Sequence, residues 1–192
     1  MQRLQKSSLG RITCLLTVCA DGTKLPPLLC FRGRPCGPIE KKELPNASFN
    51  YPKSVKYTVQ MNAWTDERVM LYWVDHVLTP YVKKAPPVII PYVMLDKYSC
   101  HHQGTVVQRI ESLGVEWDII PGGCTALVQP IDVRIGKPFK NCMRYQAEEW
   151  LMDLDWEAGK VTDCIKPVEV RQSYAKWCAK AWKDIPIDVV YN

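Results

Sequence analysis

The chain of 192 residues has an ordinary globular composition, with 47% hydrophobic and 23% charged residues, which excludes a disordered or fibrous protein. Its net charge of +5 is uneven, because residues 1–60 hold ten Lys or Arg against three Asp or Glu, whereas residues 61–192 hold fifteen against seventeen. The basic first third is typical of a surface that faces a polyanion, and equally of a solvated, solubilising face.

Several classes of protein are disfavoured by what the sequence lacks. No apolar run reaches the ~18 residues of a membrane span, so we expect no membrane partner. The nine cysteines are odd in number and contain no Cys-x-x-Cys pair, which favours reduced thiols over a disulfide framework or a zinc finger. Without a Gly-rich phosphate loop, a G-x-S-x-G motif or an H-E-x-x-H motif, we expect no small-molecule cofactor.

The first predicted element is a β-hairpin. Residues 12–18 are rich in β-forming side chains, Asp21 and Gly22 form a turn signal, and residues 28–31 resume the apolar run. After a basic loop punctuated by Gly and Pro, residues 55–61 predict a short strand.

A helix is predicted next. Thr65 can cap its start, and Pro80 marks its expected end. Its apolar side chains follow helical spacing at Met70, Trp73, Val74, Val77, Leu78 and Tyr81.

A parallel strand–helix–strand unit follows. The apolar run of residues 88–95 predicts a buried strand that Pro91 shortens to residue 92 onward. Residues 102–113 predict a helix that Gly114 ends, and residues 115–120 predict the second strand.

The rest of the chain is predicted to be helical. Pro130 suits the first position of a helix, which Gly136 and Pro138 are expected to bend or break before a second stretch over residues 139–152. A final helix carries the apolar stripe Val170, Tyr174, Trp177, Cys178, Ala181, Trp182 and Ile185, whose tryptophans we interpret as core rather than as a base-stacking surface. Together the elements predict an α/β fold with a mixed sheet.

Two aspartates are candidate metal ligands. Asp96 ends a predicted buried strand, and Asp132 falls just inside a predicted helix. Mg2+ is typically held by one or two carboxylates, with phosphate oxygens and waters completing its octahedron. The alternative is structural, with Asp96 capping a turn and Asp132 stabilising the positive end of a helix.

The order of several motifs points to a family. The chain resembles, over about residues 11–190, the DDE superfamily endonuclease domain of pogo-, Tigger- and jerky-like transposases and of centromere protein B-like proteins. The matching pieces are Arg11-Ile12-Thr13, Ala20-Asp21-Gly22-Thr23-Lys24-Leu25-Pro26-Pro27, Asn62-Ala63-Trp64, Met94-Leu95-Asp96, Ile119-Ile120-Pro121-Gly122-Gly123-Cys124-Thr125, Gln129-Pro130-Ile131-Asp132, Gly136-Lys137-Pro138-Phe139-Lys140, Trp177 and Ala181-Trp182.

The resemblance implies an RNase H-like mixed sheet flanked by helices, in which three carboxylates bind two metals, Mg2+ or Mn2+, and cut DNA. It makes Asp96 the second of the three acids and Asp132 the third, as catalytic and metal-binding residues. Two metals ~4 Å apart would stabilise the attacking and leaving oxygens of phosphoryl transfer. The nucleic-acid-binding candidates near these acids are Lys97, His101, His102, Lys137 and Lys140; the histidines could instead pack or cap, and the lysines could be solvated.

The sequence departs from the family pattern at its start. The family's first acid ends a strand that precedes Arg11, and none of the ten residues before Arg11 is acidic. Asp21 belongs to the hairpin turn and cannot replace that acid. We therefore expect an N-terminally truncated, partial domain over residues 1–192 that lacks its first central strand, with residues 153–192 as a C-terminal helical extension.

Two functions remain open at this point. The first is a transposase-derived, nuclear, DNA-binding endonuclease domain whose catalysis is impaired by the missing acid. The second is a domesticated, non-enzymatic module that binds DNA or protein and forms a homodimer.

Overall fold

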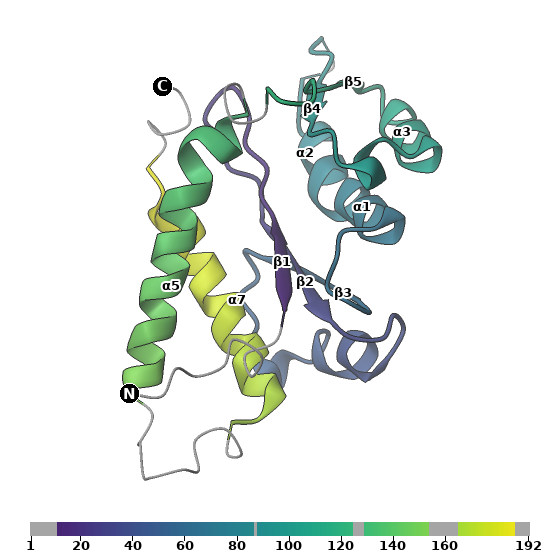
Figure 1. The fold of residues 1–192 in the computed structure, drawn as a ribbon. Helices are drawn as coiled ribbons and strands as arrows, with labels where there is room; N and C mark the ends of the chain where they lie inside the picture. Colours follow the sequence, from purple (N-terminus) through teal and green to yellow (C-terminus); the bar gives the residue numbers. More distant parts are fainter. Residues whose placement is uncertain (1–10, 87, 125–128, 154–164, 187–192) are drawn as a thin grey trace.

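The computed structural model describes residues 11–86, 88–124, 129–153 and 165–186 (Figure 1). In these ranges helices surround two small sheets. The elements in chain order are β1 (Ile12–Leu15), β2 (Leu28–Arg32), η1 (Ile39–Glu43), η2 (Ala47–Phe49), β3 (Lys56–Gln60), α1 (Glu67–Trp73), η3 (Val74–Leu78), α2 (Thr79–Val82), β4 (Tyr92–Leu95), η4 (Ser99–His102), α3 (Gly104–Glu111), β5 (Glu116–Ile119), η5 (Ile131–Ile135), α5 (Gly136–Met152) and α7 (Pro167–Asp184).

The first sheet has the strand order β1-β2-β3 and contains the predicted hairpin. β1 pairs antiparallel with β2, with Ile12 opposite Phe31, and β3 adds to β2 in parallel. At the turn, Gly22 has a φ of 78° and the Asp21 carboxylate accepts a hydrogen bond from the Thr23 N–H at 2.8 Å. The Asp-Gly signal thus works as expected, because Gly adopts a positive φ without steric penalty.

The second sheet confirms the predicted parallel unit. β4 pairs in parallel with β5, with Tyr92 opposite Glu116, and α3 forms the connection between them. The strand begins after Pro91, as predicted. The five strands of the described residues therefore form two separate sheets, of mixed and of parallel pairing, rather than the one mixed sheet that the sequence predicts.

The helix after β3 corrects two details. Its N-cap is Asp66 and not Thr65, because the Asp66 carboxylate accepts a hydrogen bond from the Val69 N–H at 2.9 Å. Pro80 does not end the helix, which continues through a π turn, η3, into α2. Pro80 lies in the first turn of α2, where the missing proline N–H is tolerated.

The predicted break at Gly136 and Pro138 is also wrong. η5 passes directly into α5, and Gly136 has helical dihedrals of −63° and −38°. Pro138 falls within the first turn of α5, and the junction is a π turn in which the Gly136 N–H donates to the Ile131 carbonyl. A wider turn, rather than a bend, accommodates these two residues.

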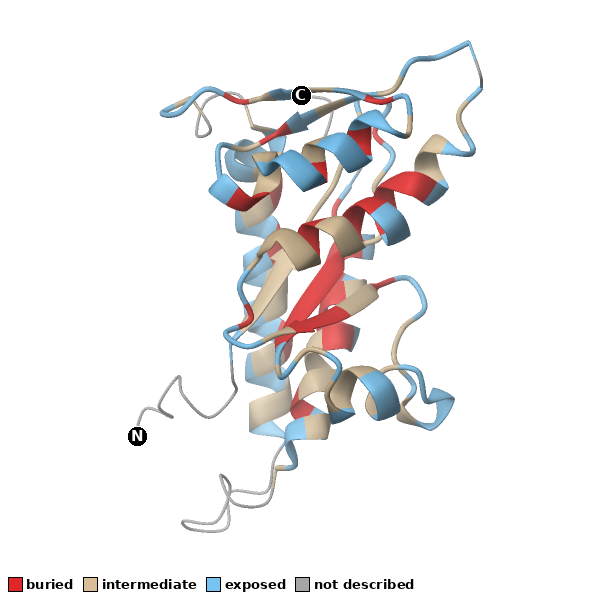
Figure 2. Cartoon of the chain, turned by 90° about the vertical axis from the view of Figure 1, so that its right-hand side faces the viewer, coloured by how far each residue is buried: buried red, intermediate tan, exposed pale blue. Residues whose placement is uncertain are grey.

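The core lies on both faces of the first sheet. Alternate residues of β2 point to opposite sides, so that Leu28 and Cys30 pack under α1 and η3, whereas Leu29 and Phe31 pack against α7. Figure 2 shows these strands as the buried centre of the molecule. The tryptophans of α7, Trp177 and Trp182, are buried, which confirms their assignment to the core.

The hairpin is tied to the end of α7, which lies beside α5 (Figure 1). Lys24 Nζ donates to the carbonyl oxygens of Trp182 at 2.6 Å and Ile185 at 2.5 Å. Trp182 Nε1 in turn donates to the Leu25 carbonyl at 2.8 Å. Lys24 therefore acts as a positive cap on carbonyl groups that the helix end leaves unpaired.

Among the described residues, no helix combines the length and the apolar composition that a membrane span requires.

Candidate functional site

Asp96 leaves the carboxyl end of β4, as the sequence predicts. The Ile120 N–H donates to the Leu95 carbonyl at 2.8 Å, so the turn after β5 begins beside Asp96. The side chain of Lys97 lies against this turn, because a Cβ built on Gly122 would approach Lys97 Cδ at 3.1 Å. The Pro-Gly-Gly segment and the Met-Leu-Asp segment are therefore neighbours at one edge of the parallel pair.

The Asp96 carboxylate is already engaged inside the protein. Its Oδ1 contacts His101 Nδ1, and it also accepts a hydrogen bond from the Tyr98 N–H at 3.2 Å. The contact with His101 lowers the pKa of Asp96, with a smaller contribution from the Tyr98 N–H, against the raising effect of burial. His101 thus pairs with Asp96 rather than projecting freely toward a bound polymer.

Two further polar atoms near these motifs are buried without a partner. His102 Nδ1 and Gln129 Oε1 make no hydrogen bond within the part of the chain that the structure describes. A buried polar group usually finds a partner, so each such atom calls for an explanation such as an ion, a water or a ligand. His102 follows the residue that contacts Asp96, and Gln129 opens the Gln-Pro-x-Asp motif.

Asp132 is the second residue of η5 and is exposed. Its N–H donates to the Gln129 carbonyl at 3.0 Å, which places the carboxylate in the first helical turn, near the positive end of the dipole. The local positions of Asp96 and Asp132 agree with the prediction from sequence. They agree equally with the structural roles of turn cap and helix-end charge.

The described residues do not by themselves make a metal site. Within ranges 11–86, 88–124, 129–153 and 165–186, no three His, Cys, Asp or Glu side chains cluster so that they could hold an ion. Of the two candidate acids, Asp96 has one oxygen directed to His101. The donor set present does not fit a two-metal centre, which needs further carboxylate oxygens.

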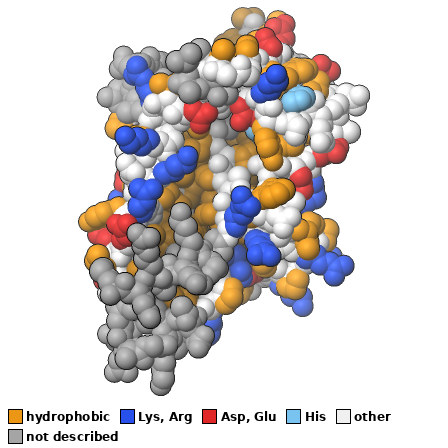
Figure 3. Space-filling model, in the orientation of Figure 1, with side chains coloured by type: hydrophobic (Ala, Val, Ile, Leu, Met, Phe, Trp, Pro, Cys, Tyr) orange, Lys and Arg blue, Asp and Glu red, His pale blue; other side chains and the backbone are white. Residues whose placement is uncertain are grey.

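A row of basic side chains follows Asp132 along α5. Lys137, Lys140 and Arg144 are exposed, and their spacing of three and four residues places them on one face of the helix. Figure 3 shows Lys and Arg side chains over this side of the molecule, beside an apolar hollow with acidic groups at its upper edge. Lys137 and Lys140 have no carboxylate partner among the described residues.

Sequence reasoning missed a second group of polar residues. Arg11, Arg32, Asn62 and Trp64 line one hollow at the edge of the first sheet. Arg11 and Asn62-Ala63-Trp64 belong to family-like motifs, but their sequence separation of about fifty residues gave no sign that they meet.

Comparisons with known proteins identify the family. The model of the DDE superfamily endonuclease family matches residues 9–192. The mouse (Mus musculus) protein "Pogo transposable element with KRAB domain" is 28% identical over 175 residues, and its human (Homo sapiens) namesake is 28% identical over 178 residues; each match covers 91% of this chain and 27% of the relative. The human "Pogo transposable element with ZNF domain" is 24% identical over 150 residues, covering 76% of this chain and 10% of the relative.

The chain thus spans about a quarter, or less, of the length of these curated relatives. No solved structure shows a significant match. The family match covers nearly the whole chain and includes both candidate acids. The chain belongs to the DDE superfamily endonucleases, as a pogo-like member.

Proposed function

We propose that this polypeptide is a nuclear, DNA-binding DDE domain that does not cleave DNA by itself. The observation that carries the proposal is the match to the DDE superfamily endonuclease family over residues 9–192, a range that contains Asp96 and Asp132. Within the 192 residues, no acid precedes Asp21, which belongs to the hairpin turn.

The chemistry explains why two acids are insufficient. Two-metal catalysis requires carboxylates from separate elements to converge on both ions. With Asp96 paired to His101 and Asp132 exposed, Mg2+ or Mn2+ would be held weakly or in a position unsuited to in-line displacement. Because the residues of such a site act as a unit, losing one removes most of the rate enhancement.

DNA binding, unlike cleavage, does not require converging carboxylates or metal ions. Exposed Lys and Arg side chains release condensed counterions from phosphates without any preformed metal site. The stripe of Lys137, Lys140 and Arg144 runs along α5 directly after Asp132, and Lys97 lies at the edge of the second sheet. We propose that these residues contact the backbone of DNA near the two acids.

Fluorescence anisotropy with a labelled DNA duplex tests this proposal. The logarithm of the association constant should fall linearly with the logarithm of salt concentration, by about 0.9 per phosphate contacted. Replacing Lys137 and Lys140 by Ala should reduce that slope by about two, whereas the matched double replacement of Lys41 and Lys42, exposed on η1, should leave it unchanged. A salt-independent affinity, or equal effects of both double variants, would contradict it.

We further propose that one more strand fits between the two sheets and carries the first acid. In the described residues, β1 and β4 each have a neighbour on one side only. Tyr92 and Met94 of β4 are 54% and 58% exposed, so one face of this parallel pair is also uncovered. A strand in this position would pair with both open edges and join the two sheets.

Hydrogen exchange tests the proposed additional strand. Joining a designed β-strand ahead of Arg11 through a flexible linker should slow amide exchange in both β1 and β4. A designed helix on the same linker is the control. The proposal would be contradicted if neither β1 nor β4 exchanged more slowly, or if the fused helix slowed their exchange as much as the fused strand.

The alternative function is a domesticated protein-binding module that forms a homodimer. The specific observation in its favour is the exposed apolar group beside β4, which comprises Val88, Ile89, Ile90, Tyr92 and Met94. Exposed apolar side chains in such a group are typical of interaction surfaces. Light scattering separates the two: a dimer that Tyr92→Lys and Met94→Lys together dissociate favours this alternative.

A further inference from the structure

The hollow lined by Arg11, Arg32, Asn62 and Trp64 lies at one end of the first sheet and is open and basic. It has a volume of about 160 Å3, and all of its lining residues are exposed. This is many times the ~10–15 Å3 that a cavity needs to hold a single water molecule. The hollow can therefore hold one phosphate group with part of its hydration.

Arg11 and Arg32 give this hollow two positive charges. The Arg11 guanidinium lies 5.4 Å from the centre of the Trp64 ring, where a cation–π interaction holds it. Neither Arg11 nor Arg32 forms an ion pair with a carboxylate in the part of the chain that the structure describes. Two free guanidinium groups at one hollow favour an anion, and their planar donors match phosphate oxygens.

Hydrogen bonds and one buried side chain fix the loop that carries Asn62 and Trp64. The Gln60 side-chain oxygen accepts hydrogen bonds from the Asn62 and Trp64 N–H groups at 2.7 and 3.0 Å. Thr13 Oγ1 donates to the Ala63 carbonyl at 2.6 Å, and the side chain of Ala63 is fully buried. A loop fixed in this way loses little conformational entropy when a ligand binds.

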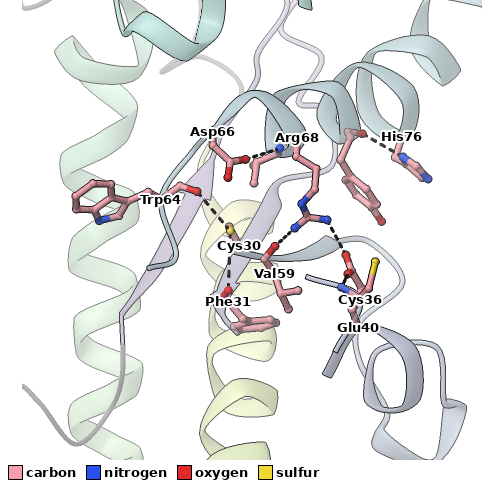
Figure 4. Close-up of polar contacts among 11 residues, drawn as sticks. Cys30, Phe31, Cys36, Glu40, Val59, Trp64, Asp66, Arg68 and His76 are labelled. Atoms are coloured by element: carbon pink, nitrogen blue, oxygen red, sulfur yellow. Dashed lines mark hydrogen bonds and ion pairs between the residues drawn. The ribbon is translucent and has the colours of Figure 1, made fainter. Parts of the chain in front are cut away.

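Figure 4 shows how Trp64 is anchored. Cys30 Sγ, on β2, donates to the Trp64 carbonyl at 3.8 Å, while the indole ring projects away from α1. Trp64 is 49% exposed, so its contact with Arg11 lies at the surface and not in the core.

We propose that the Arg11–Trp64 hollow binds a phosphodiester group of DNA, with both guanidinium groups and the Asn62 amide as donors. Trp64 positions Arg11. The inference rests on the proposed DNA binding and adds a contact supplied by β1, β2 and the loop after β3, separate from the basic stripe on α5. A free phosphate ion has the same chemistry, and the experiment must distinguish it from DNA.

Anisotropy with the labelled duplex provides the main test, with Arg34→Ala as the matched control, because Arg34 is exposed two residues beyond Arg32 but does not line the hollow. Arg32→Ala should weaken binding roughly three- to fivefold and lower the salt slope by about 0.9, whereas Arg34→Ala should change neither. Trp64→Ala should weaken binding similarly, and Trp64→Phe should restore most of it because a ring remains for Arg11.

Nuclear magnetic resonance gives a readout that does not depend on the stripe. A short thymidine oligonucleotide should shift the indole N–H signal of Trp64, assigned by its loss in Trp64→Phe, and Arg32→Ala should abolish the shift. Saturation by inorganic phosphate at the same concentration would overturn the assignment to DNA. Equal binding by the Arg32 and Arg34 variants, with the Lys137 and Lys140 double variant still impaired, would overturn this inference alone; a wild type that binds no DNA would overturn the proposed function as well.

Discussion

Replacing Gly136 by Ala tests the π turn that carries Asp132. Ala is favoured over Gly in a helix interior by about 0.8–1.0 kcal/mol, and the backbone of Gly136 is already helical, so propensity alone predicts a more stable protein. A Cβ built on Gly136, however, would lie 2.8 Å from the Ile131 carbonyl oxygen, which is backbone and cannot rotate away. Relieving a contact of this kind costs about 1–3 kcal/mol.

We therefore expect Gly136→Ala to lower the free energy of unfolding by up to about 2 kcal/mol net, which for a chain of this size lowers Tm by up to roughly 8 °C. Gly104→Ala is the matched control, because Gly104 is also helical and a Cβ there would meet no atom within 4 Å. That variant should gain about 0.4–1 kcal/mol.

Thermal and urea unfolding, followed by far-ultraviolet circular dichroism, compare the two variants. The decisive result is the sign of each change. If Gly136→Ala is as stabilising as Gly104→Ala, the helix has no π turn at this position, and the geometry assigned to Asp132 is wrong.

Two further predictions concern long-range contacts of the described chain. Arg171 forms a bidentate ion pair with Glu43, with N–O distances of 2.8 and 2.5 Å. Arg171→Ala should lower the free energy of unfolding by about 3 kcal/mol in a urea titration. Arg109→Ala, which removes an exposed pair with Asp75, should change it by under about 1 kcal/mol. Burial raises the pKa of Glu43, but hydrogen bonds from Arg171 and Tyr51 outweigh this effect, so the pKa is lowered overall. The stability that the pair contributes should therefore be present above about pH 4.3 and lost as the pH falls through the folded pKa. If the free energies of unfolding of wild type and Arg171→Ala differed by the same amount at every pH, this prediction would be contradicted. Lys24→Met should cost about 1–3 kcal/mol by leaving carbonyls at the end of α7 unpaired, and no change in Tm would show that solvent replaces this cap.

The spacing of apolar residues predicts the helices that bury one face against a sheet. The stripe from Met70 to Tyr81 and the stripe on α7 are found where predicted, because a helix that covers a sheet must present apolar residues every three or four positions. The hairpin and the strand after Pro91 are likewise local signals. The helix ends predicted at Pro80 and Gly136 are wrong, because a π turn precedes each residue and the helix continues through it.

The candidate site is predictable only in part. Sequence places Asp96 after a strand and Asp132 in a helical turn, but it cannot show that His101 turns back onto Asp96. The Arg11–Trp64 hollow forms because the loop after β3 brings Asn62 and Trp64 next to Arg11. No repeat or spacing in the sequence predicts this contact. Contacts of this kind depend on tertiary packing.

Supercoiled plasmid incubated with the polypeptide and Mn2+ gives the most direct test of a DNA-binding domain without cleavage. At protein concentrations that saturate the DNA in anisotropy, wild type and Asp96→Ala should both leave the plasmid supercoiled. Nicking by wild type that disappears in Asp96→Ala and in Asp132→Ala would show that the two acids suffice for catalysis and would contradict the account.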